Sequence, residues 1–418
     1  LMIIRRDIHL NRLKSRKHNG MIKVITGIRR CGKSYILMNL FREHLISSGV
    51  SEECIISVDL EDRRNKDLRD PDALLGYIDS HMKSQIMNYI LLDEIQLVPE
   101  FEDVLNSYVG MPNADVYVTG SNAHLLSKDV ITEFRGRGDE IRITPLSFSE
   151  FCSVKNGNRS DLLNEYMTYG GLPQAVLKED IREKEEYLKG TFAHTYIKDI
   201  RERYDIRKDD DLEELINIIA SNIGGLTNPR RLSNTFMSVK HSMLSADTIK
   251  NYLDILQDAF LIEKSIRYDI KGKHYIDTPS KYYFSDTGLR NARLDFRQTE
   301  FPHLMENVIY NELRFRGLSV DVGEVGFTET MNDGRRKRST LEVDFVCNQG
   351  YRRYYIQSAY ALPDRAKMDQ EMSSLLKISD GFRKFIISGQ PSPMYQNDDG
   401  IMIMNIWDFL MNPESLSL

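Results

Sequence analysis

Short apolar runs alternate with helical periodicity through the first 150 residues. Four runs, at residues 21–26, 54–62, 88–93 and 114–122, are rich in β-branched and other apolar residues, as buried parallel strands are. The residues after the first run, "YILMNLFREHL" from Tyr35, repeat their apolar positions with the period of a helix. Strands that alternate with helices predict a three-layer αβα unit on a parallel sheet.

The later residues show other patterns. Helical periodicity fills residues 161–220, after the polar stretch 155–165. A helix over 247–257, with Ser245 as its N-cap, precedes two short strands around a basic turn. An amphipathic helix is expected at 303–317, strands at 341–350 and 352–362, and a strand pair with a closing helix between 381 and 412.

Composition and charge restrict the class of protein. The chain has 41% hydrophobic and 28% charged residues, as globular proteins do, and its 418 residues require more than one domain. The net charge of −6 argues against a nucleic-acid coat over the whole chain but permits a local basic face. No apolar run approaches the ~20 residues needed to cross a bilayer. Four scattered cysteines without a CxxC pair predict a reducing, cytoplasmic location without a zinc site.

The strongest chemical signal is "GIRRCGKS" after the first strand. Gly27 and Gly32 let the backbone curl its N–H groups around phosphate oxygens, and the next helix adds the positive end of its dipole. Lys33 would reach the β- and γ-phosphates, and the Ser34 hydroxyl would bind Mg²⁺. A chance match remains the alternative. The residues expected to contact ATP are Gly27, Ile28, Arg29, Arg30, Cys31, Gly32, Lys33, Ser34 and Tyr35.

Two acids end the strand that begins at residue 88. Asp93 would hold Mg²⁺, directly or through water, because a buried strand-end carboxylate needs a cation or solvent. Glu94 would polarise the attacking water, and the pair therefore predicts ATP hydrolysis rather than binding alone. The alternative is a strand-end acid that caps the next helix. Asp59 and Glu61 follow a neighbouring strand and are further Mg²⁺ or water ligands to test.

Polar residues after the fourth strand are the remaining catalytic candidates. Ser121 or Asn122 would orient the attacking water or sense the γ-phosphate, although Thr-Gly-Ser-Asn is also an ordinary turn. Arg135 or Arg137 would act as an arginine finger, within the chain or on a neighbouring subunit. The alternative is that these arginines are only solvated. We select Glu94, Asn122 and Arg137 as the catalytic set.

These motifs together resemble a known family. "GIRRCGKS", "YILLDEIQ", "VYVTGSN", the Gly-Arg at 136–137, "ITPLSFSEF" and "YGGLPQAV" occur in the order found in bacterial and archaeal AAA-superfamily P-loop ATPases with a C-terminal domain of unknown function. The resemblance spans nearly the whole chain. It implies an AAA-type αβα core, ATP and Mg²⁺, and it implies no particular biological role.

The helix over 247–257 and the strands after it read as a winged helix. Asp247, Lys250 and Asn251 on the exposed helix face, and Lys271, Lys273 and Lys281 on the hairpin, would meet DNA. Winged helices also bind proteins, and the acids on this helix weaken a DNA face. The further cations that could touch a phosphate backbone are Arg335, Arg336 and Arg338 in "GRRKRS", with Arg352 and Arg353. The alternative for "GRRKRS" is a hairpin tip kept soluble by charge.

The last third resembles the PD-(D/E)xK nucleases with the catalytic set broken. Glu306 would be the helix acid and Asp344 the strand acid that hold Mg²⁺. The third element should read Glu-x-Lys, but this chain has Gln357-Ser358-Ala359. Because alanine cannot replace the lysine, a retained fold used for binding or assembly is expected rather than an active nuclease.

The predicted class is therefore α/β. Its expected parts are an AAA-type ATPase domain (1–155), a helical connector (156–230), a winged-helix region (231–290) and an inactive nuclease-like domain (291–418). The leading hypothesis is an ATPase switch or motor that moves its C-terminal modules on DNA or a protein partner. A non-hydrolysing nucleotide-gated scaffold and an ATP-dependent nuclease are the alternatives. A homo-oligomer or protein partner, and no membrane contact, complete the expectations.

Overall fold

The computed structural model describes residues 4–120, 134, 136–204, 209–240, 244–330 and 336–417. Contacts divide the chain into two compact units, Leu1–Leu146 with Asp258–Phe260, and Ser147–Gln257 with Leu261–Leu418. In the described residues no helix is both long enough and apolar enough to span a membrane. The four-part division expected from the sequence stays a prediction.

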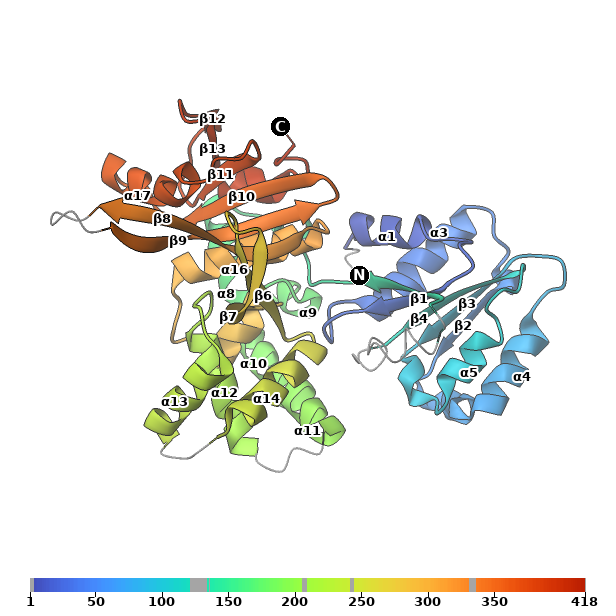
Figure 1. Ribbon diagram of the computed structural model, residues 1–418. Coiled ribbons are helices and arrows are strands. Elements are labelled where there is room, and N and C mark those ends of the chain that lie inside the picture. The colour runs from blue at the N-terminus through green and yellow to red at the C-terminus, as the bar shows by residue number, and fades with distance from the viewer. Residues whose placement is uncertain are drawn as a thin grey trace. The chain divides into compact units, whose positions relative to one another are not determined.

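The N-terminal unit is a three-layer αβα fold around a five-stranded parallel sheet, as predicted (Figure 1). The sheet order is β2-β3-β4-β1-β5, so β1 lies between β4 and β5. Its strands are β1 (Ile22–Thr26), β2 (Ile55–Asp59), β3 (Asn88–Asp93), β4 (Ala114–Thr119) and β5 (Gly138–Arg142).

Helices cover both faces of this sheet. The helices α4 (Pro71–His81) and α5 (Phe101–Asn106) pack one face, where Leu74, Ile78 and Leu105 join a core of strand residues. The other face carries the continuous helical segment after β1. The remaining elements are α1 (Asp7–Lys14), α2 (Lys33–Tyr35), η1 (Ile36–Phe41), α3 (Arg42–Ser47), η2 (Glu52–Cys54), η3 (Arg63–Arg69) and η4 (Ile95–Leu97).

The C-terminal unit joins a group of helices to an eight-stranded mixed sheet. Its first helices are α7 (Phe148–Cys152), α8 (Arg159–Tyr169), α9 (Pro173–Val176), α10 (Ile181–Gly190), η6 (Thr191–Ile197), α11 (Lys198–Tyr204), α12 (Asp209–Ser221), α13 (Pro229–Lys240) and α14 (Ala246–Asp258). The predicted N-cap of α14 is present, because Ser245 Oγ accepts the Thr248 N–H at 3.1 Å.

The large sheet has the order β12-β13-β11-β10-β9-β8-β6-β7. The hairpin predicted after α14 is present as β6 and β7, and β6 also pairs in parallel with β8. The strands are β6 (Ile262–Asp269), β7 (His274–Phe284), β8 (Ser319–Thr330), β9 (Arg336–Gln349), β10 (Arg352–Ala359), β11 (Arg383–Ser388), β12 (Tyr395–Gln396) and β13 (Ile401–Asn405). The helices between and after them are α15 (Thr287–Arg293), α16 (Phe301–Phe315), α17 (Arg365–Leu376) and α18 (Ile406–Met411). The hairpin is thus an edge of the sheet rather than a separate wing.

Candidate nucleotide-binding and hydrolysis site

The loop after β1 is bent by residues in the left-handed region. Gly27 has φ +139°, Arg30 +63° and Gly32 +100°. A Cβ at Gly27 would lie 2.0 Å from the Ile143 carbonyl oxygen, so only glycine lets β1 pass this close to the segment after β5. Successive turns of this kind direct backbone N–H groups to one side, which is the arrangement that binds anions.

The Lys33 side chain is hydrogen-bonded to the backbone of its own loop. Its ammonium donates to the carbonyl oxygens of Gly27 (3.0 Å) and Ile28 (3.2 Å), and the side chain is buried. These hydrogen bonds join a buried cation to neutral carbonyl oxygens rather than to a carboxylate. A phosphate in the loop would supply a counter-ion, because the lysine already lies where the loop curls.

The rest of the motif divides into buried and exposed positions. Ile28 and Cys31 are buried, and Arg30, Ser34 and Tyr35 are exposed. The buried Arg6 holds the loop from behind, with its guanidinium donating to the Cys31 carbonyl at 2.9 Å and to the Thr144 carbonyl at 2.6 Å. Ile28 and Cys31 therefore contribute their backbone to the loop rather than their side chains.

Ser34 and Asp93 meet at the edge of the sheet where the parallel strands end. The Thr119 hydroxyl donates to the Asp93 carboxylate. Burial raises the pKa of Asp93, and the nearby Thr119 and Ser34 hydroxyls oppose that rise. The hydroxyl of the glycine loop thus lies near the strand-end acid, although 59 positions separate them in the sequence.

Glu94, which follows Asp93, has an unusual backbone conformation. It has φ +54° and ψ +50°, and its N–H donates to Thr119 Oγ1 at 3.0 Å. The Gln96 amide donates to the Glu94 carboxylate. A non-glycine residue in the left-handed region carries strain that the neighbouring bonds must hold, and such strain gathers at functional sites.

Thr119 was not among the predicted site residues. Its hydroxyl donates to Asp93 and accepts from the Glu94 backbone, so it fixes both acids. The signal available in the sequence was its place near the end of the strand expected over 114–122, because parallel sheets gather ligand groups at the carboxyl ends of their strands. The predicted polar residues Ser121 and Asn122 lie outside the described residues.

The other predicted residues have different positions. Asp59 is opposite Asp93 in the β2–β3 register, and its carboxylate accepts the Glu61 N–H at 2.9 Å. Arg135 lies outside the described residues.

Arg137 is exposed, and its carbonyl accepts the N–H of Ile22. Ile22 begins β1, whereas the glycine loop follows the last residue of that strand. Five strand residues span roughly 16 Å. The Arg137 backbone thus lies at the other end of β1 from the loop, and its role as an arginine finger, within the chain or on a neighbouring subunit, stays a prediction.

The donor set suits Mg²⁺ together with phosphate. Among the described residues there is no group of three or more His, Cys, Asp or Glu side chains placed to hold a metal alone. Mg²⁺ is commonly bound by one or two protein oxygens with the remaining ligands from phosphate and water. The Ser34 hydroxyl and Asp93 carboxylate provide those two oxygens.

The acids predicted to form a nuclease-like set surround Lys281, which was predicted to lie on the DNA-contacting hairpin. The ammonium of Lys281 lies 2.9 Å from Glu306, 2.7 Å from Glu342 and 3.7 Å from Asp344. Lys281 is 3% exposed, so the predicted contact of Lys281 with DNA is wrong. Burial, with the Glu306 charge, raises the pKa of Asp344 to about 8. Lys281 reaches the acids from β7, which no local pattern could reveal.

Apart from Lys281 and the half-buried Arg353, the described cations that were predicted to contact DNA are exposed. Lys271 and Lys273 lie in the β6–β7 turn, and Arg336 and Arg338 lie on β9. Arg335 lies outside the described residues.

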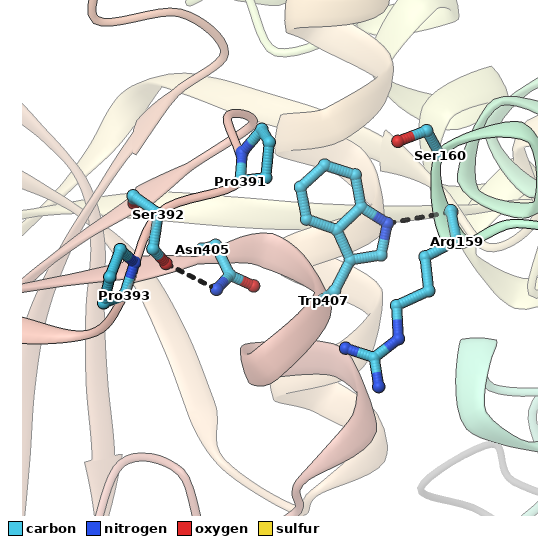
Figure 2. Close-up of a pocket in the computed structure, with 7 residues that line it drawn as sticks. All are labelled: Arg159, Ser160, Pro391, Ser392, Pro393, Asn405 and Trp407. Carbon is cyan, nitrogen blue, oxygen red and sulfur yellow. Dashed lines mark hydrogen bonds between the residues drawn. The ribbon is translucent and has the colours of Figure 1, made fainter.

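A separate cavity of about 370 Å³ lies between the start of α8 and the start of α18. Figure 2 shows the Trp407 indole beside it, with Nε1 donating to the Arg159 carbonyl at 2.8 Å. Asn405 donates to the Ser392 carbonyl at 2.8 Å on the other side. Since both polar side chains already have backbone partners, this cavity offers a surface but no arrangement for catalysis.

Comparisons with known proteins agree with the division of the chain. Residues 19–152 match a family model described as an AAA domain, and residues 160–300 match a domain of unknown function. An uncharacterized protein of Haemophilus influenzae is 35% identical over 417 residues, covering 98% of this chain and 99% of the relative. An uncharacterized protein of Methanocaldococcus jannaschii is 29% identical over 377 residues, covering 87% and 79%. The Aeropyrum pernix ORC1 protein, solved in complex with DNA, aligns with 11% identity and a TM-score of 0.32 over 70% of this chain and 93% of that chain.

Proposed function

The chain belongs to the family of the Haemophilus influenzae protein, with an AAA domain at residues 19–152, and we propose that this domain binds and hydrolyses ATP with Mg²⁺. The observation that carries the proposal is the glycine loop around the buried Lys33 ammonium, together with the acids Asp93 and Glu94 that Thr119 holds at the end of β3. A phosphate loop alone would support binding. The strand-end acids beside it support hydrolysis.

Each residue of the site would have its own role in binding the phosphates and Mg²⁺. Lys33 would turn from the carbonyls of Gly27 and Ile28 to the β- and γ-phosphates, which replaces two neutral acceptors with charged ones. Ser34 and Asp93 would hold Mg²⁺, which supplies charge neutralisation at the phosphates when bound. Thr119 would then fix the Asp93 carboxylate and the Glu94 backbone in position relative to each other.

Glu94 would act as the base that orients and polarises water. Its carboxylate accepts from the Gln96 amide, which limits its rotation, while its backbone is bonded to Thr119. Positioned general bases contribute typically 10²–10⁴-fold to a rate. Arg137 of a neighbouring subunit would supply charge stabilisation, and Asn122 would help to orient the water.

The nucleotide state would act on the C-terminal unit, which contacts DNA or a protein partner. The exposed cations Lys271, Lys273, Arg336 and Arg338 support DNA contact, and Arg335 belongs to the same run. The position of Lys281 among three carboxylates disfavours nuclease chemistry, because its ammonium already pairs with the acids that would hold a metal.

The test is phosphate release by Lys33→Ala and Glu94→Gln. We expect Glu94→Gln to lower turnover by about 100-fold or more and to keep ATP affinity, because the base is lost while the loop is intact. Lys33→Ala should lose both binding and turnover. Circular dichroism should show both variants folded.

The matched controls are Lys66→Ala and Glu100→Gln, which remove the same charges from exposed positions of the same unit. Both should turn over ATP as the unaltered protein does. Turnover unchanged in both site variants would defeat the hydrolysis proposal. ATP bound tightly by the unaltered protein without phosphate release would favour the non-hydrolysing scaffold.

A further inference from the structure

A cavity of about 330 Å³ in the C-terminal unit is lined by aromatic rings and cations from three separate turns. The β6–β7 turn contributes Lys273, the β9–β10 turn contributes Tyr351 with Arg352 at the start of β10, and the segment after α17 contributes Phe382. Such a volume lies at the lower end of the range for small-ligand sites and admits one flat ring system.

Aromatic side chains are exposed around this cavity. Tyr351 is 86% exposed, Tyr275 56% and Phe382 41%. In the part of the chain that the structure describes, four Phe or Tyr side chains are at least 41% exposed, and three of them lie here. Leaving large rings in water costs hydrophobic free energy, and a cluster of them marks a contact surface more than isolated exposed rings do.

The cations are held against these rings. The Arg353 guanidinium lies 4.9 Å from the centre of the Tyr268 ring and 5.5 Å from that of Phe382. Its Nε donates to Asn348 Oδ1 at 2.8 Å, which fixes its plane. The Arg352 guanidinium lies 5.7 Å from the centre of the exposed Tyr351 ring.

The cavity wall is positive on balance. Lys273, Arg352 and Arg353 face one lining carboxylate, that of Asp380. Asp380 is itself engaged, because it accepts the Tyr355 hydroxyl at 2.5 Å. A ligand with anionic groups beside a flat ring would meet both features of the wall.

We propose that this cavity receives an unpaired base of a single-stranded nucleic acid, with the adjoining phosphates on Arg352, Arg353 and Lys273. Every base has a flat face that stacks on an aromatic ring, whereas the base faces in a duplex are covered by their neighbours. An acidic peptide would use the cations but leave Tyr351 and Phe382 without a partner. The inference rests on the proposed function only in taking nucleic acid as the C-terminal partner.

The experiment measures fluorescence anisotropy of a labelled single-stranded oligonucleotide of about 12 nucleotides, a length within the usual site sizes. No nucleotide triphosphate is added. We expect Tyr351→Ala and Phe382→Ala each to weaken binding by about 5- to 100-fold, the loss typical of one stacking partner. Arg352→Gln should lower the slope of log affinity against log salt by roughly one phosphate contact.

The matched control is Tyr395→Ala, which removes an equally large exposed ring from β12 at the opposite edge of the sheet. It should bind as the unaltered protein does, and Tyr351→Trp should keep the affinity because it keeps a ring. Because Tyr351 is almost fully exposed, its removal leaves the core intact.

Two further arms separate the outcomes. Equal affinity for a duplex of the same length, or for polyglutamate, would overturn the inference and in the second case assign a protein partner. Affinity unchanged in Tyr351→Ala would overturn it as well. Lys33→Ala should bind the oligonucleotide normally, so failure of the ATPase proposal and failure of this one give different results.

Discussion

At the scale of single residues, Gly27 is the position where a small change has the largest calculable effect. An added Cβ would lie 2.0 Å from a backbone oxygen of Ile143, which cannot rotate away, and φ +139° is strained for any other residue. We expect Gly27→Ala to lower the free energy of unfolding of the N-terminal unit by about 2 to 4 kcal/mol. It should also abolish ATP binding, because the loop must shift to relieve the clash.

Gly76→Ala is the control for this substitution. Gly76 lies in α4 with no atom within 4 Å of an added Cβ, and alanine favours helix by up to about 1 kcal/mol. Urea unfolding followed by circular dichroism, with calorimetric titration of ATP, measures both effects. A Gly27→Ala protein as stable as Gly76→Ala and still able to bind ATP would contradict the reading of the loop.

The residues that the sequence revealed are those whose chemistry depends on local spacing. Gly27, Lys33 and Asp93 could be assigned because a glycine loop and a strand-end acid are defined by neighbours in the chain. Thr119 and Lys281 could not, because each acquires its role from residues on other strands or helices. Their partners follow from register and packing, which one sequence does not specify.

At the scale of elements, the start of α15 is built around a buried acid. Asp286 accepts the Leu289 N–H at 3.0 Å as the helix cap and the Gly171 N–H at 2.7 Å from the segment after α8. A Cβ at Gly170 would lie 2.2 Å from the same carboxylate, which explains the first glycine in "YGGLP". Burial raises the pKa of Asp286 to about 6, against the backbone bonds that lower it.

This pKa predicts a pH dependence of stability. Between its ordinary value near 4 and about 6, folded Asp286 keeps a proton that the unfolded chain has released. The folded state therefore binds more protons in this window, and its stability falls as the pH rises. A shift of about two units corresponds to roughly 3 kcal/mol.

Asp286→Asn tests this dependence, because the amide keeps an acceptor for the cap and removes the titration. We expect the free energy of unfolding of the C-terminal unit, measured in urea at intervals from pH 4 to pH 6.5, to fall more steeply in the unaltered protein than in the variant. Parallel curves would show that Asp286 does not titrate in this window.

Periodicity located the elements but not their partners. The strands at β1, β3 and β4 and the helix α16 follow from apolar runs and amphipathic spacing. The hairpin of β6 and β7 was also expected, with its basic turn. Its place as the edge of an eight-stranded sheet depends on the parallel pairing of β6 with β8, which joins residues more than 50 positions apart.

At the scale of the whole molecule, the chain carries two units with different candidate ligands. We propose ATP for the loop Gly27–Ser34 in the first unit and an unpaired base for the cavity at Tyr351 in the second. A switch requires that one ligand change the affinity for the other. Such a coupling is a free energy shared by both sites, so it must be reciprocal.

The last prediction is this reciprocity. In Glu94→Gln, which should bind ATP without consuming it, we expect saturating ATP to change oligonucleotide affinity by about 5- to 150-fold, the usual range for coupled sites. Saturating oligonucleotide should then change ATP affinity by the same factor. Lys33→Ala should show no effect of ATP, and Tyr351→Ala none of the oligonucleotide at concentrations that saturate the unaltered protein. Both ligands bound with no mutual effect would leave an ATPase and a nucleic-acid module on one chain without a switch between them, because a ligand that binds two states equally shifts neither.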